Sequence, residues 1–573
     1  MYCRVLACDF DGTCASDGHL APETADVLRA ARVRGIATML VTGRVLEELR
    51  RGEVDFSAFD AVVAENGAIV WLPALDRTIQ LGEPPPEWFL GRLRDSGIAF
   101  QAGAVVIGTW EQHAGHALQL IRETGLDLQL VFNRAAVMLL PSGINKAVGV
   151  QRALDELGRS ARNMIAFGDA ENDLPLFTLA EVGVAARGSV PAIVAVADDR
   201  LTQPGPPGVA YYVQRLVEAG GRAPTTGRRR LELGLTSWRE PATLPAGETN
   251  VLVSGDPRSG KSWLAGLIAE RMIEDGYRVC ILDPEGDYAS LATRPGVVLV
   301  GERIGLPAPG DVAAVLSDVG ASLVVNLTSL SQPQKCQYVC AAIETLAQHR
   351  AQTGLPHWTL IDEAHYFFHP GRECCAPFLA HTGNVVLVSY RPSLIAPEVH
   401  DTIGAHLLTC TAIEAERYFM ETLLAARGPE GFHPADALRD VERPRAGMLL
   451  QTPDGPRWQT FLPGSRLAPH VHHGRKYVDA TFGNDRAFRF LFADGRPAIA
   501  HNVREFTDAL AMVPLASLRH HLRNGDFSRW ARDVLGDADL ATGLEKVERT
   551  TALGAEPRRE ELIAHIRDRY MLW

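Results

Sequence analysis

The sequence predicts an α/β protein with two successive parallel-sheet modules, followed by a small, mainly helical C-terminal domain. Short runs of Val, Ile, Leu and Ala alternate with amphipathic stretches over residues 1–220 and again over residues 232–466. Such runs are typical of parallel strands that helices cover on both faces. Residues 470–573 lack these runs and are richer in His and Arg, which indicates a helical accessory domain.

Bulk composition narrows the class of protein. Of the 573 residues, 46% are hydrophobic and 22% are charged, as in soluble globular proteins. The net charge of -12 does not favour nucleic acid as a partner, although a local basic patch stays open as an alternative. No apolar run is long enough to span a membrane, and the N-terminus does not have the pattern of a signal peptide. We therefore expect a cytoplasmic protein without a membrane segment.

In the first module, the strands are predicted from apolar runs and the helices from amphipathic stretches. The predicted strands include Val5–Cys8, Ala37–Val41, Ala61–Ala64 and Met164–Phe167. Pro22 to Arg34 has a helical pattern. The alternation of apolar runs and amphipathic stretches is interrupted between about residues 80 and 140, which predicts an inserted module.

Residues 221–231 contain Gly, Pro, Thr and Arg and have no apolar face, so they predict a linker. We expect its arginines, Arg228 to Arg230, to be solvated; a nucleic-acid contact is the alternative.

The second module has its own set of apolar runs. Its predicted strands are Val251–Val253, Val279–Leu282, Leu323–Val325, Trp358–Ile361 and Val385–Val388. In the C-terminal domain, Val503 to Leu522 has the pattern of an amphipathic helix.

Two aspartates follow the first strand of the chain. Asp9 lies at its carboxyl end, the edge at which α/β sheets bind ligands. There it can attack a phosphoryl group, while Asp11, beyond the turn at Gly12, can give and take a proton. Two carboxylates repel a phosphate dianion, so the site also needs cations.

Later segments supply groups of the required kinds. Thr42 ends the next strand with a hydroxyl that can hold phosphoryl oxygens, and Lys146 can neutralise them. Asp169 to Asp173 end a later strand with carboxylates suited to Mg²⁺.

In their order, these elements resemble the haloacid dehalogenase superfamily of phosphatases, and in particular its Cof-type branch, which includes archaeal phosphoglycolate phosphatases. Ala64-Glu65-Asn66-Gly67-Ala68 is similar to the Glu-Asn-Gly element of that branch. The resemblance implies a Rossmann-like domain over residues 1–220, with a small α/β cap at about residues 80–140. A decayed phosphatase that serves as a scaffold is the alternative.

The resemblance also implies roles for individual residues. Asp9 would be the nucleophile and Asp11 the acid/base, while Thr42 and Lys146 would bind phosphate. Mg²⁺ would bind Asp9, Asp169 and the Asp11 carbonyl, with Asp173 supporting the metal site. The candidate substrate-binding residues are Thr42, Gly43, Arg44, Asn66, Lys146 and Asn172.

The second module contains a phosphate-binding loop. Gly255-Asp256-Pro257-Arg258-Ser259-Gly260-Lys261-Ser262 follows a strand and matches the G-x-x-x-x-G-K-S pattern. Its amides form an anion nest at a helix N-terminus, where Lys261 reaches the β- and γ-phosphates and Ser262 holds Mg²⁺. Trp358–Ile361 is a strand that ends in two acids, so that Asp362 can hold Mg²⁺ and Glu363 can activate water.

Three further segments resemble the HerA/FtsK class of ATPases, in particular its HerA-like branch: Asp283-Pro284-Glu285-Gly286-Asp287-Tyr288, Ile361 to His365, and Ser389 to Ser393. Tyr390 replaces a Gln that is common in the class, which shifts the polar sensor role to Ser389. The resemblance implies a RecA-like P-loop NTPase domain that hydrolyses ATP in a homo-oligomer, such as a hexameric ring. An arginine would complete each site from the neighbouring subunit, with Arg391, Arg417 and Arg427 as candidates.

The cysteines and histidines give weaker signals. The nine cysteines are expected to be reduced thiols; a zinc site near Cys336, Cys340 and Cys374-Cys375 is the alternative. The histidines of the C-terminal domain, His470, His472, His473, His501, His520 and His521, are expected to be surface or capping residues rather than metal ligands.

The sequence therefore predicts a bifunctional hydrolase: a Mg²⁺-dependent phosphatase of a phosphorylated small molecule, joined to an ATPase. One alternative is a nucleic-acid-associated motor or defence ATPase whose phosphatase domain processes nucleotides or phosphorylated ends. The other is a regulatory module in which ATP gates the phosphatase without turnover.

Overall fold

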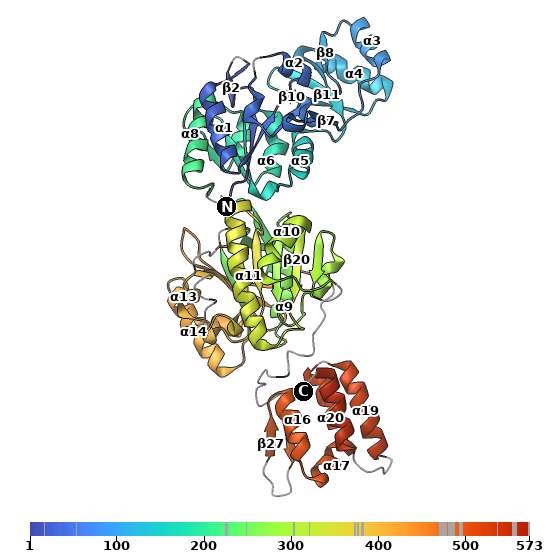
Figure 1. The fold of residues 1–573 in the computed structure, drawn as a ribbon, viewed down its shortest axis with the longest axis vertical. Helices are drawn as coiled ribbons and strands as arrows, with labels where there is room; N and C mark the ends of the chain where they lie inside the picture. The colour runs from blue at the N-terminus through green and yellow to red at the C-terminus, as the bar shows by residue number, and fades with distance from the viewer. Residues whose placement is uncertain are drawn as a thin grey trace.

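A computed structural model describes the whole chain except residues 17, 53, 224–226, 248, 302–303, 320, 372–373, 375–377, 380–382, 469–477, 479–486, 492–496, 536, 553–557 and 571–573. Figure 1 shows three bodies in a row, with the N-terminal module at one end, the second module in the middle and the helical domain at the other end. The predicted fold class is confirmed. None of the helices in the described parts of the chain is both long and apolar enough to cross a membrane.

An eight-stranded sheet forms the centre of the N-terminal body. In spatial order its strands are β14 (Asp199–Arg200), β13 (Val182–Ala185), β12 (Met164–Gly168), β1 (Val5–Asp9), β4 (Ala37–Val41), β5 (Ala61–Ala64), β6 (Ile69–Leu72) and β7 (Arg77–Gln80). The strands from β14 to β5 are parallel, so their carboxyl ends lie at one edge.

Both faces of this sheet are buried, as the continuous apolar runs predict. Leu6 and Cys8 of β1 pack in one core, which includes residues of α1 (Pro22–Val33) and α8 (Gly205–Glu218). Val5 and Ala7 point the other way, into a core with residues of α5 (Lys146–Glu156), α6 (Leu174–Leu179) and α7 (Pro191–Val196).

The inserted segment forms its own small α/β layer, which we call the cap. Its antiparallel sheet has the order β10 (Leu128–Asn133), β11 (Ala136–Pro141), β9 (Ile107–Trp110) and β8 (Phe100–Ala102). A separate apolar core joins this sheet to α3 (Glu87–Asp95) and α4 (Ala114–Thr124).

The middle body contains an eleven-stranded sheet. In spatial order its strands are β16 (Pro241–Pro245), β15 (Arg230–Thr236), β25 (Arg457–Pro463), β24 (Ala446–Leu450), β23 (Ile403–Leu408), β17 (Asn250–Ser254), β22 (Val385–Ser389), β21 (Trp358–Ile361), β18 (Val279–Asp283), β20 (Ser322–Asn326) and β19 (Val297–Val300). The strands from β23 to β19 are parallel, and the other four pair antiparallel.

Helices cover both faces of this sheet as well. One core contains α9 (Lys261–Glu274), and the core on the other face contains α10 (Val312–Val319) and α11 (Gln332–Thr353). A short helix, α13 (Pro397–His400), lies between β22 and β23, and two further helices, α14 (Glu414–Arg427) and α15 (Pro434–Arg439), follow β23.

The C-terminal body is mainly helical. Its elements are β26 (Phe488–Leu491), β27 (Pro497–Ala500), α16 (Val503–Met512), α17 (Leu515–Asn524), α18 (Asp526–Trp530), a π-helical turn (Ala531–Leu535), α19 (Ala538–Ala552) and α20 (Arg559–Tyr570). The prediction of one helix from Val503 to Leu522 is wrong. Pro514 disfavours helical backbone at Val513, whose ψ is 138°, so the segment splits into α16 and α17.

A buried polar seam joins the first two bodies, and we define it by Glu181, Tyr277, Asn163 and His357. The Tyr277 hydroxyl lies 3.0 Å from both Glu181 carboxylate oxygens. His357 Nε2 lies 3.0 Å from Asn163 Oδ1, and His357 Nδ1 accepts a hydrogen bond of 2.8 Å from the Arg278 amide. All four seam residues are buried, so this contact belongs to the folded core.

The segment that we expected to be a solvated linker is bound to the protein instead. Gly221 and Ala223 form backbone hydrogen bonds with Cys3 and Met1. Arg228 donates to the carbonyls of Phe177 and Ala180, and the Arg229 guanidinium lies 3.2 Å from Glu181. Backbone hydrogen bonds and arginine side chains thus hold this segment against the N-terminal body.

Candidate functional site

The first candidate site lies at the carboxyl edge of the N-terminal sheet, where β1 ends at Asp9. Lys146, the first residue of α5, places its ammonium nitrogen 2.5 Å from Asp9 Oδ1 and 2.6 Å from Asp173 Oδ1. The Lys146 side chain is 1% exposed. A charge that is buried this deeply is stable only when it is paired, and here two carboxylates pair with it.

The loop after β12 brings a third carboxylate. The other oxygen of Asp173 accepts hydrogen bonds from the amides of Asp169 and Ala170, which fixes the loop. Ligand atoms of Asp9, Asp169 and Asp173 all lie within 4.8 Å of one another. Gly12 lies directly against this group, because a side-chain carbon there would come within 2.9 Å of Asp169 Oδ2.

Burial shapes the electrostatics of the site. It raises the pKa of Asp9 well above its ordinary value, and the charge of Asp173 adds to this effect while Lys146 opposes it. Burial also raises the pKa of Asp169, against the influence of Arg134. For Lys146, burial lowers the pKa, but Asp173 and Asp9 outweigh it, so the net shift is upward. Burial therefore disfavours the charged forms of Asp9 and Asp169, and a further cation at this site would stabilise them.

Arg134 is a contributor from the cap that the sequence did not reveal. It lies in the turn between β10 and β11 and contacts the Asp169 carboxylate. Its φ of 52° is a left-handed conformation that an arginine seldom adopts. The cap is therefore closed onto the carboxylates in this structure.

The other predicted residues surround the carboxylate group. Asp11 is half-exposed and accepts two hydrogen bonds from Arg44, of 2.8 and 2.6 Å, so its side chain lies outside the buried cluster. Thr42 is buried, and its hydroxyl accepts a hydrogen bond from the Arg44 amide. Asn172 donates to Asn66, and Asn66 Nδ2 and Asn172 Oδ1 have no hydrogen-bond partner among the described residues.

A single buried glutamate anchors the cap to the sheet. Glu65 accepts hydrogen bonds from the amides of Ala104, Val105 and Val106, at 3.0, 2.8 and 3.0 Å. Gly67, with a φ of 101°, lets the chain pass the Asn145 carbonyl, which a side-chain carbon would approach to 1.9 Å. Between cap and sheet lies a cavity of about 610 Å³, whose lining includes Asp11, Gly43, Arg44, Trp110 and Met138.

The second candidate site lies at the carboxyl edge of the middle sheet. The loop after β17 has left-handed backbone at Gly255 (φ 150°), Arg258 (φ 66°) and Gly260 (φ 107°) and leads into α9. A side chain at Gly255 would collide with the Thr409 hydroxyl, at 2.0 Å. Lys261 and Ser262 begin the helix and are buried.

The remaining loop residues have structural contacts. The Asp256 carboxylate accepts hydrogen bonds from the amides of Ala412 and Ile413, at 2.6 and 3.3 Å. Pro257 and Arg258 follow it, and Arg258 donates to the Asp533 carbonyl of the helical body at 3.1 Å. The Ser259 hydroxyl lies 2.5 Å from that of Thr409.

The predicted motifs of this module contribute three buried acidic residues, Asp287, Asp362 and Glu363. Asp362 and Glu363 follow β21, are fully buried, and are joined by a hydrogen bond of 2.9 Å from the Glu363 amide to Asp362 Oδ1. The Ser262 hydroxyl donates to Asp287 at 2.7 Å. Asp287 was not assigned a role from the sequence, although the segment that contains it was recognised. Asp283 before it accepts hydrogen bonds from four backbone amides, and burial raises its pKa to about 7.

Residues of the last predicted motif surround the acidic group. The Ser389 hydroxyl lies 3.2 Å from His365 Nδ1, which is 3.5 Å from a Glu363 oxygen. Burial lowers the pKa of His365 to about 4. The ring of Tyr390 packs against His365 and lies 5.8 Å from the Lys261 ammonium, and Arg391 lies over the same ring.

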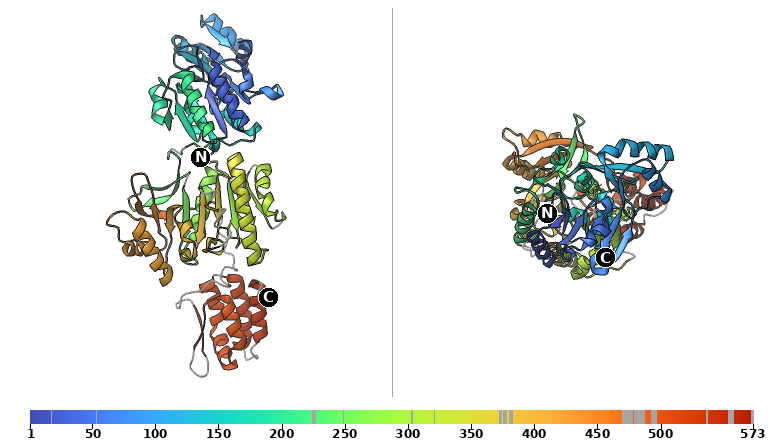
Figure 2. Two further views of the ribbon diagram at one scale, coloured as in Figure 1. Left: turned by 60° about the vertical axis from the view of Figure 1, so that its left-hand side comes forward. Right: turned by 90° about the horizontal axis from the view of Figure 1, so that it is seen from above.

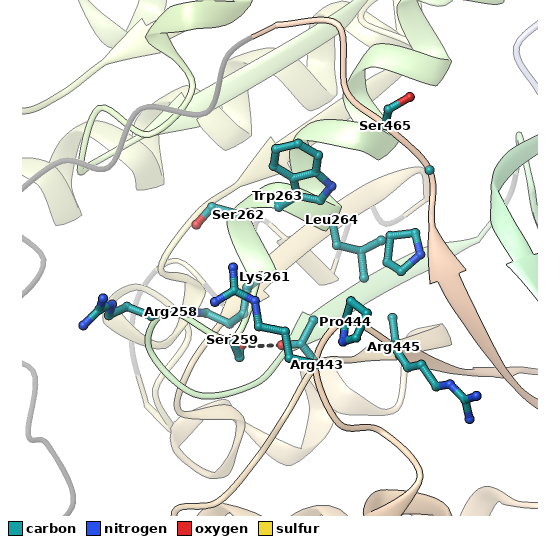
Figure 3. A pocket seen from close by; sticks show the side chains of 15 residues that line it. Arg258, Ser259, Lys261, Ser262, Trp263, Leu264, Arg443, Pro444, Arg445 and Ser465 are labelled. Atoms are coloured by element: carbon teal, nitrogen blue, oxygen red, sulfur yellow. Dashed lines mark hydrogen bonds between the residues drawn. The ribbon is translucent and has the colours of Figure 1, made fainter. Parts of the chain in front are cut away.

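A cavity of about 470 Å³ opens beside the phosphate-binding loop (Figure 3). Besides the loop itself, its lining includes Trp263, Arg443, Pro444, Arg445 and Pro463. Trp263 directly follows the phosphate-binding motif, whereas Arg443, Pro444, Arg445 and Pro463 belong to no motif and come from later segments of the chain, so the sequence did not point to them.

The structure describes only some of the cysteines and histidines for which the sequence left a metal site open. The cysteines that the structure describes are free thiols, and Cys375 lies outside the described residues. His470, His472 and His473 also lie outside them. His520, His521 and Asp526 do come together, but His521 is hydrogen-bonded to Asp526 at 2.8 Å, as in a helix-end contact.

Family models match two parts of the chain. Residues 6–80 and 128–213 match a haloacid dehalogenase-like hydrolase, and residues 253–352 match the central domain of helicase HerA. The first match leaves out residues 81–127, which include α3, β8, β9 and α4 of the cap.

Curated relatives resemble the N-terminal body. Phosphoglycolate phosphatase 2 of Saccharolobus solfataricus is 26% identical over 223 residues, which are 37% of this chain and 92% of the relative. Phosphoglycolate phosphatase of Methanothermobacter thermautotrophicus is 26% identical over 230 residues, which are 37% of this chain and 99% of the relative.

Solved structures match the same part. A haloacid dehalogenase-like hydrolase of Bacteroides thetaiotaomicron has 18% identity and a TM-score of 0.32, and the match covers 37% of this chain and 99% of that one. A haloacid dehalogenase-like hydrolase from B. subtilis also has 18% identity and a TM-score of 0.32, and the match covers 37% of this chain and 99% of that one. The two family matches together show that the chain joins a haloacid dehalogenase-like hydrolase domain to a HerA-like domain.

Proposed function

We propose that the chain is a bifunctional hydrolase that releases phosphate from a phosphorylated small molecule and also hydrolyses ATP. The observation that supports the first activity most directly is the buried group of Asp9, Asp169 and Asp173 around the Lys146 ammonium. The curated relatives act on a small phosphate ester, phosphoglycolate, according to their names. The cavity under the cap gives such a molecule room beside Asp11.

The residues present fit a magnesium ion. Three carboxylates share a small volume, and burial disfavours their charges, so a divalent cation would stabilise the group. The contact of Arg134 with Asp169 puts a cationic side chain against the same carboxylates. Asp9, Asp169 and the Asp11 carbonyl would hold the ion and Asp173 would support them; when bound, it would neutralise the phosphate's charge.

The phosphatase reaction then has two steps on this chain's own residues. The Asp9 carboxylate attacks phosphorus, and Asp11 gives a proton to the leaving oxygen. Asp11 next takes a proton from a water molecule that attacks the aspartyl-phosphate, which returns Asp9 to its free form. Lys146 and Thr42 hold the phosphoryl oxygens throughout, and Arg44 orients Asp11 through its two hydrogen bonds.

The ATPase reaction would use the second site. The loop amides from Gly255 to Gly260 and the Lys261 ammonium bind the phosphates, and Ser262 and Asp362 hold Mg²⁺. Glu363 takes a proton from the attacking water. The match to a HerA domain supports a homo-oligomer as the working form, such as a ring.

Phosphate release from a generic aryl phosphate tests the first activity. We expect turnover with Mg²⁺, loss of turnover with a chelator, and a fall of about 10³-fold or more in Asp9→Asn, which keeps the shape but loses the nucleophile. Asp26→Asn, in an exposed carboxylate of α1, is the matched control. If Asp9→Asn keeps wild-type turnover, the covalent mechanism is wrong.

A further inference from the structure

The cavity beside the phosphate-binding loop has an unusual charge for a chain whose net charge is -12. Of the fifteen residues that line it, four are basic and none is acidic; the basic ones are Arg258, Lys261, Arg443 and Arg445. It also opens at the N-terminus of α9, where backbone amides favour an anion. Two independent features thus make this cavity an anion site.

Among the basic residues, Arg443 is placed to act on an anion. Figure 3 shows its side chain extending across the cavity towards Lys261, whereas the side chains of Arg258 and Arg445 point away. Arg443 is exposed to solvent. No carboxylate or carbonyl in the described parts of the chain pairs with its guanidinium, so it can bind a ligand without breaking a contact.

The arginines suggested by the family resemblance are engaged elsewhere. Arg417 lies 3.2 Å from Glu421 on the same helix, and Arg427 lies 2.9 Å from Asp401. Arg391 lies over the ring of Tyr390, at 5.5 Å. To reach a nucleotide in a neighbouring subunit, Arg417 and Arg427 would first have to break these ion pairs.

We propose that Arg443 binds the phosphate chain of the nucleotide held by its own chain, as a second cation beside Lys261. This inference rests on the proposed ATP site. The residue lies in the loop between α15 and β24, and β24 is separated from β17, which leads into the phosphate-binding loop, by β23 alone in the sheet order. Elements attached to one sheet therefore carry both cations.

The rest of the cavity suits the remainder of a nucleotide. Trp263, Leu264, Pro444 and Pro463 give it an apolar wall, which matches an aromatic base. A guanidinium offers paired donors that fit phosphate oxygens, so a lysine at position 443 would keep the charge but lose that geometry.

Binding of ATP, ADP and pyrophosphate to the full chain, measured by calorimetry, tests the assignment. We expect Arg443→Ala to weaken binding of all three about 10- to 100-fold, since charged hydrogen bonds contribute about 1.5–3 kcal/mol. The Arg443→Lys variant should bind each ligand more tightly than Arg443→Ala but more weakly than the wild type. Arg439→Ala, an exposed residue of α15 outside the cavity, should bind as the wild type does.

The outcomes separate two kinds of failure. If the wild type binds ATP and Arg443→Ala binds it equally well, the role of Arg443 is wrong and the proposed ATP site stands. If the wild type binds none of the three ligands, the proposed ATP site fails together with this inference. Thermal unfolding of each variant shows whether it has folded.

Mixing two variants, at an ATP concentration too low for Arg443→Ala alone to hydrolyse it at an appreciable rate, tests whether Arg443 acts within its own chain. Lys261→Ala and Arg443→Ala chains are combined, and ATP hydrolysis is compared with the sum of the separate proteins. A residue that serves its own site cannot rescue a neighbour, so we expect no gain. Regained activity would mean that Arg443 acts across a subunit boundary and would overturn the proposal.

Discussion

At the scale of single residues, the two sites stabilise charge in different ways. The N-terminal site surrounds one buried ammonium, that of Lys146, with carboxylates. The middle site contains two fully buried acids, Asp362 and Glu363, and a buried lysine, Lys261, at the start of α9. Glu363 has left-handed backbone (φ 48°), a costly conformation for this residue type. Such strain is common where a side chain must point at a reacting group, which agrees with the proposed role as base.

Lys261→Ala and Glu363→Gln should both abolish ATP hydrolysis, but for different reasons. Lys261→Ala removes a phosphate contact and should weaken ATP binding about tenfold or more. Glu363→Gln keeps the shape and removes the base, so ATP should stay bound without being hydrolysed. Calorimetry beside a phosphate-release assay distinguishes the two. Equal loss of ATP binding in both variants would show that Glu363 is not the base.

At the scale of elements, catalytic residues gather because parallel strands present their carboxyl ends at one edge. Asp9 is the last residue of β1, Thr42 follows β4 and Asp169 follows β12, and these strands are neighbours in the sheet. The cap is not part of this sheet. Hydrogen bonds from its backbone amides to Glu65 hold it to the same edge.

Glu65→Ala should loosen the cap. Three amides of the segment 104–106 would lose their acceptor, so we expect a loss of about 2–4 kcal/mol in the free energy of unfolding. The KM for a phosphate ester should rise, because the cavity depends on the position of the cap. Denaturant unfolding and steady-state kinetics measure the two effects. Glu47→Ala, an exposed residue of α2 (Leu46–Arg51), is the control. An unchanged free energy would show that the cap is held by other contacts.

At the scale of the whole molecule, the two sheets meet at the ends opposite their sites. Asn163 directly precedes β12 and His357 directly precedes β21, so the seam joins the amino ends of strands. The sites therefore face away from one another, and the loop of the second site turns towards the helical body, where Arg258 contacts Asp533. Figure 2 shows the same order of bodies in a second orientation.

Acid should weaken the seam. Burial lowers the pKa of His357 well below its ordinary value of 6.5, so its folded form is neutral. Nδ1 accepts from the Arg278 amide, and a proton on that nitrogen would face an N–H. The stability from neutral His357 is thus complete above pH 6.5 and is lost as the pH falls below it. Thermal unfolding between pH 8 and 5 should show a steeper decline in the wild type than in His357→Gln. Equal slopes would contradict this role.

Cutting the chain tests how far the N-terminal body depends on the segment after it. A fragment of residues 1–220 contains the phosphatase motifs, and we predict that it folds and stays active. It lacks the pairing of Gly221 and Ala223 with residues 1–3 and the contacts of Arg228. We therefore expect it to unfold roughly 5–10 °C below a fragment of residues 1–231. Calorimetry of both fragments measures this difference; equal unfolding temperatures would mean that these contacts add no stability.

The sequence by itself determined the fold class and the family resemblance. Buried strands need continuous apolar runs, and phosphate loops need glycines and a lysine at fixed spacing, so both are encoded locally. The sequence also placed Asp9, Thr42 and Asp169 at strand ends, and the tertiary structure brings them together.

Only the tertiary structure decided which distant residues join them. Arg134 reaches Asp169, Arg443 lines the cavity of the phosphate-binding loop, and Glu181 meets Tyr277 across the seam. Arg134 and Asp169 are 35 residues apart in the chain, and Glu181 and Tyr277 are 96 residues apart, and no periodicity or motif records such a pairing. Contacts of this kind follow from how sheets, cap and loops pack, which is a property of the whole chain rather than of any segment.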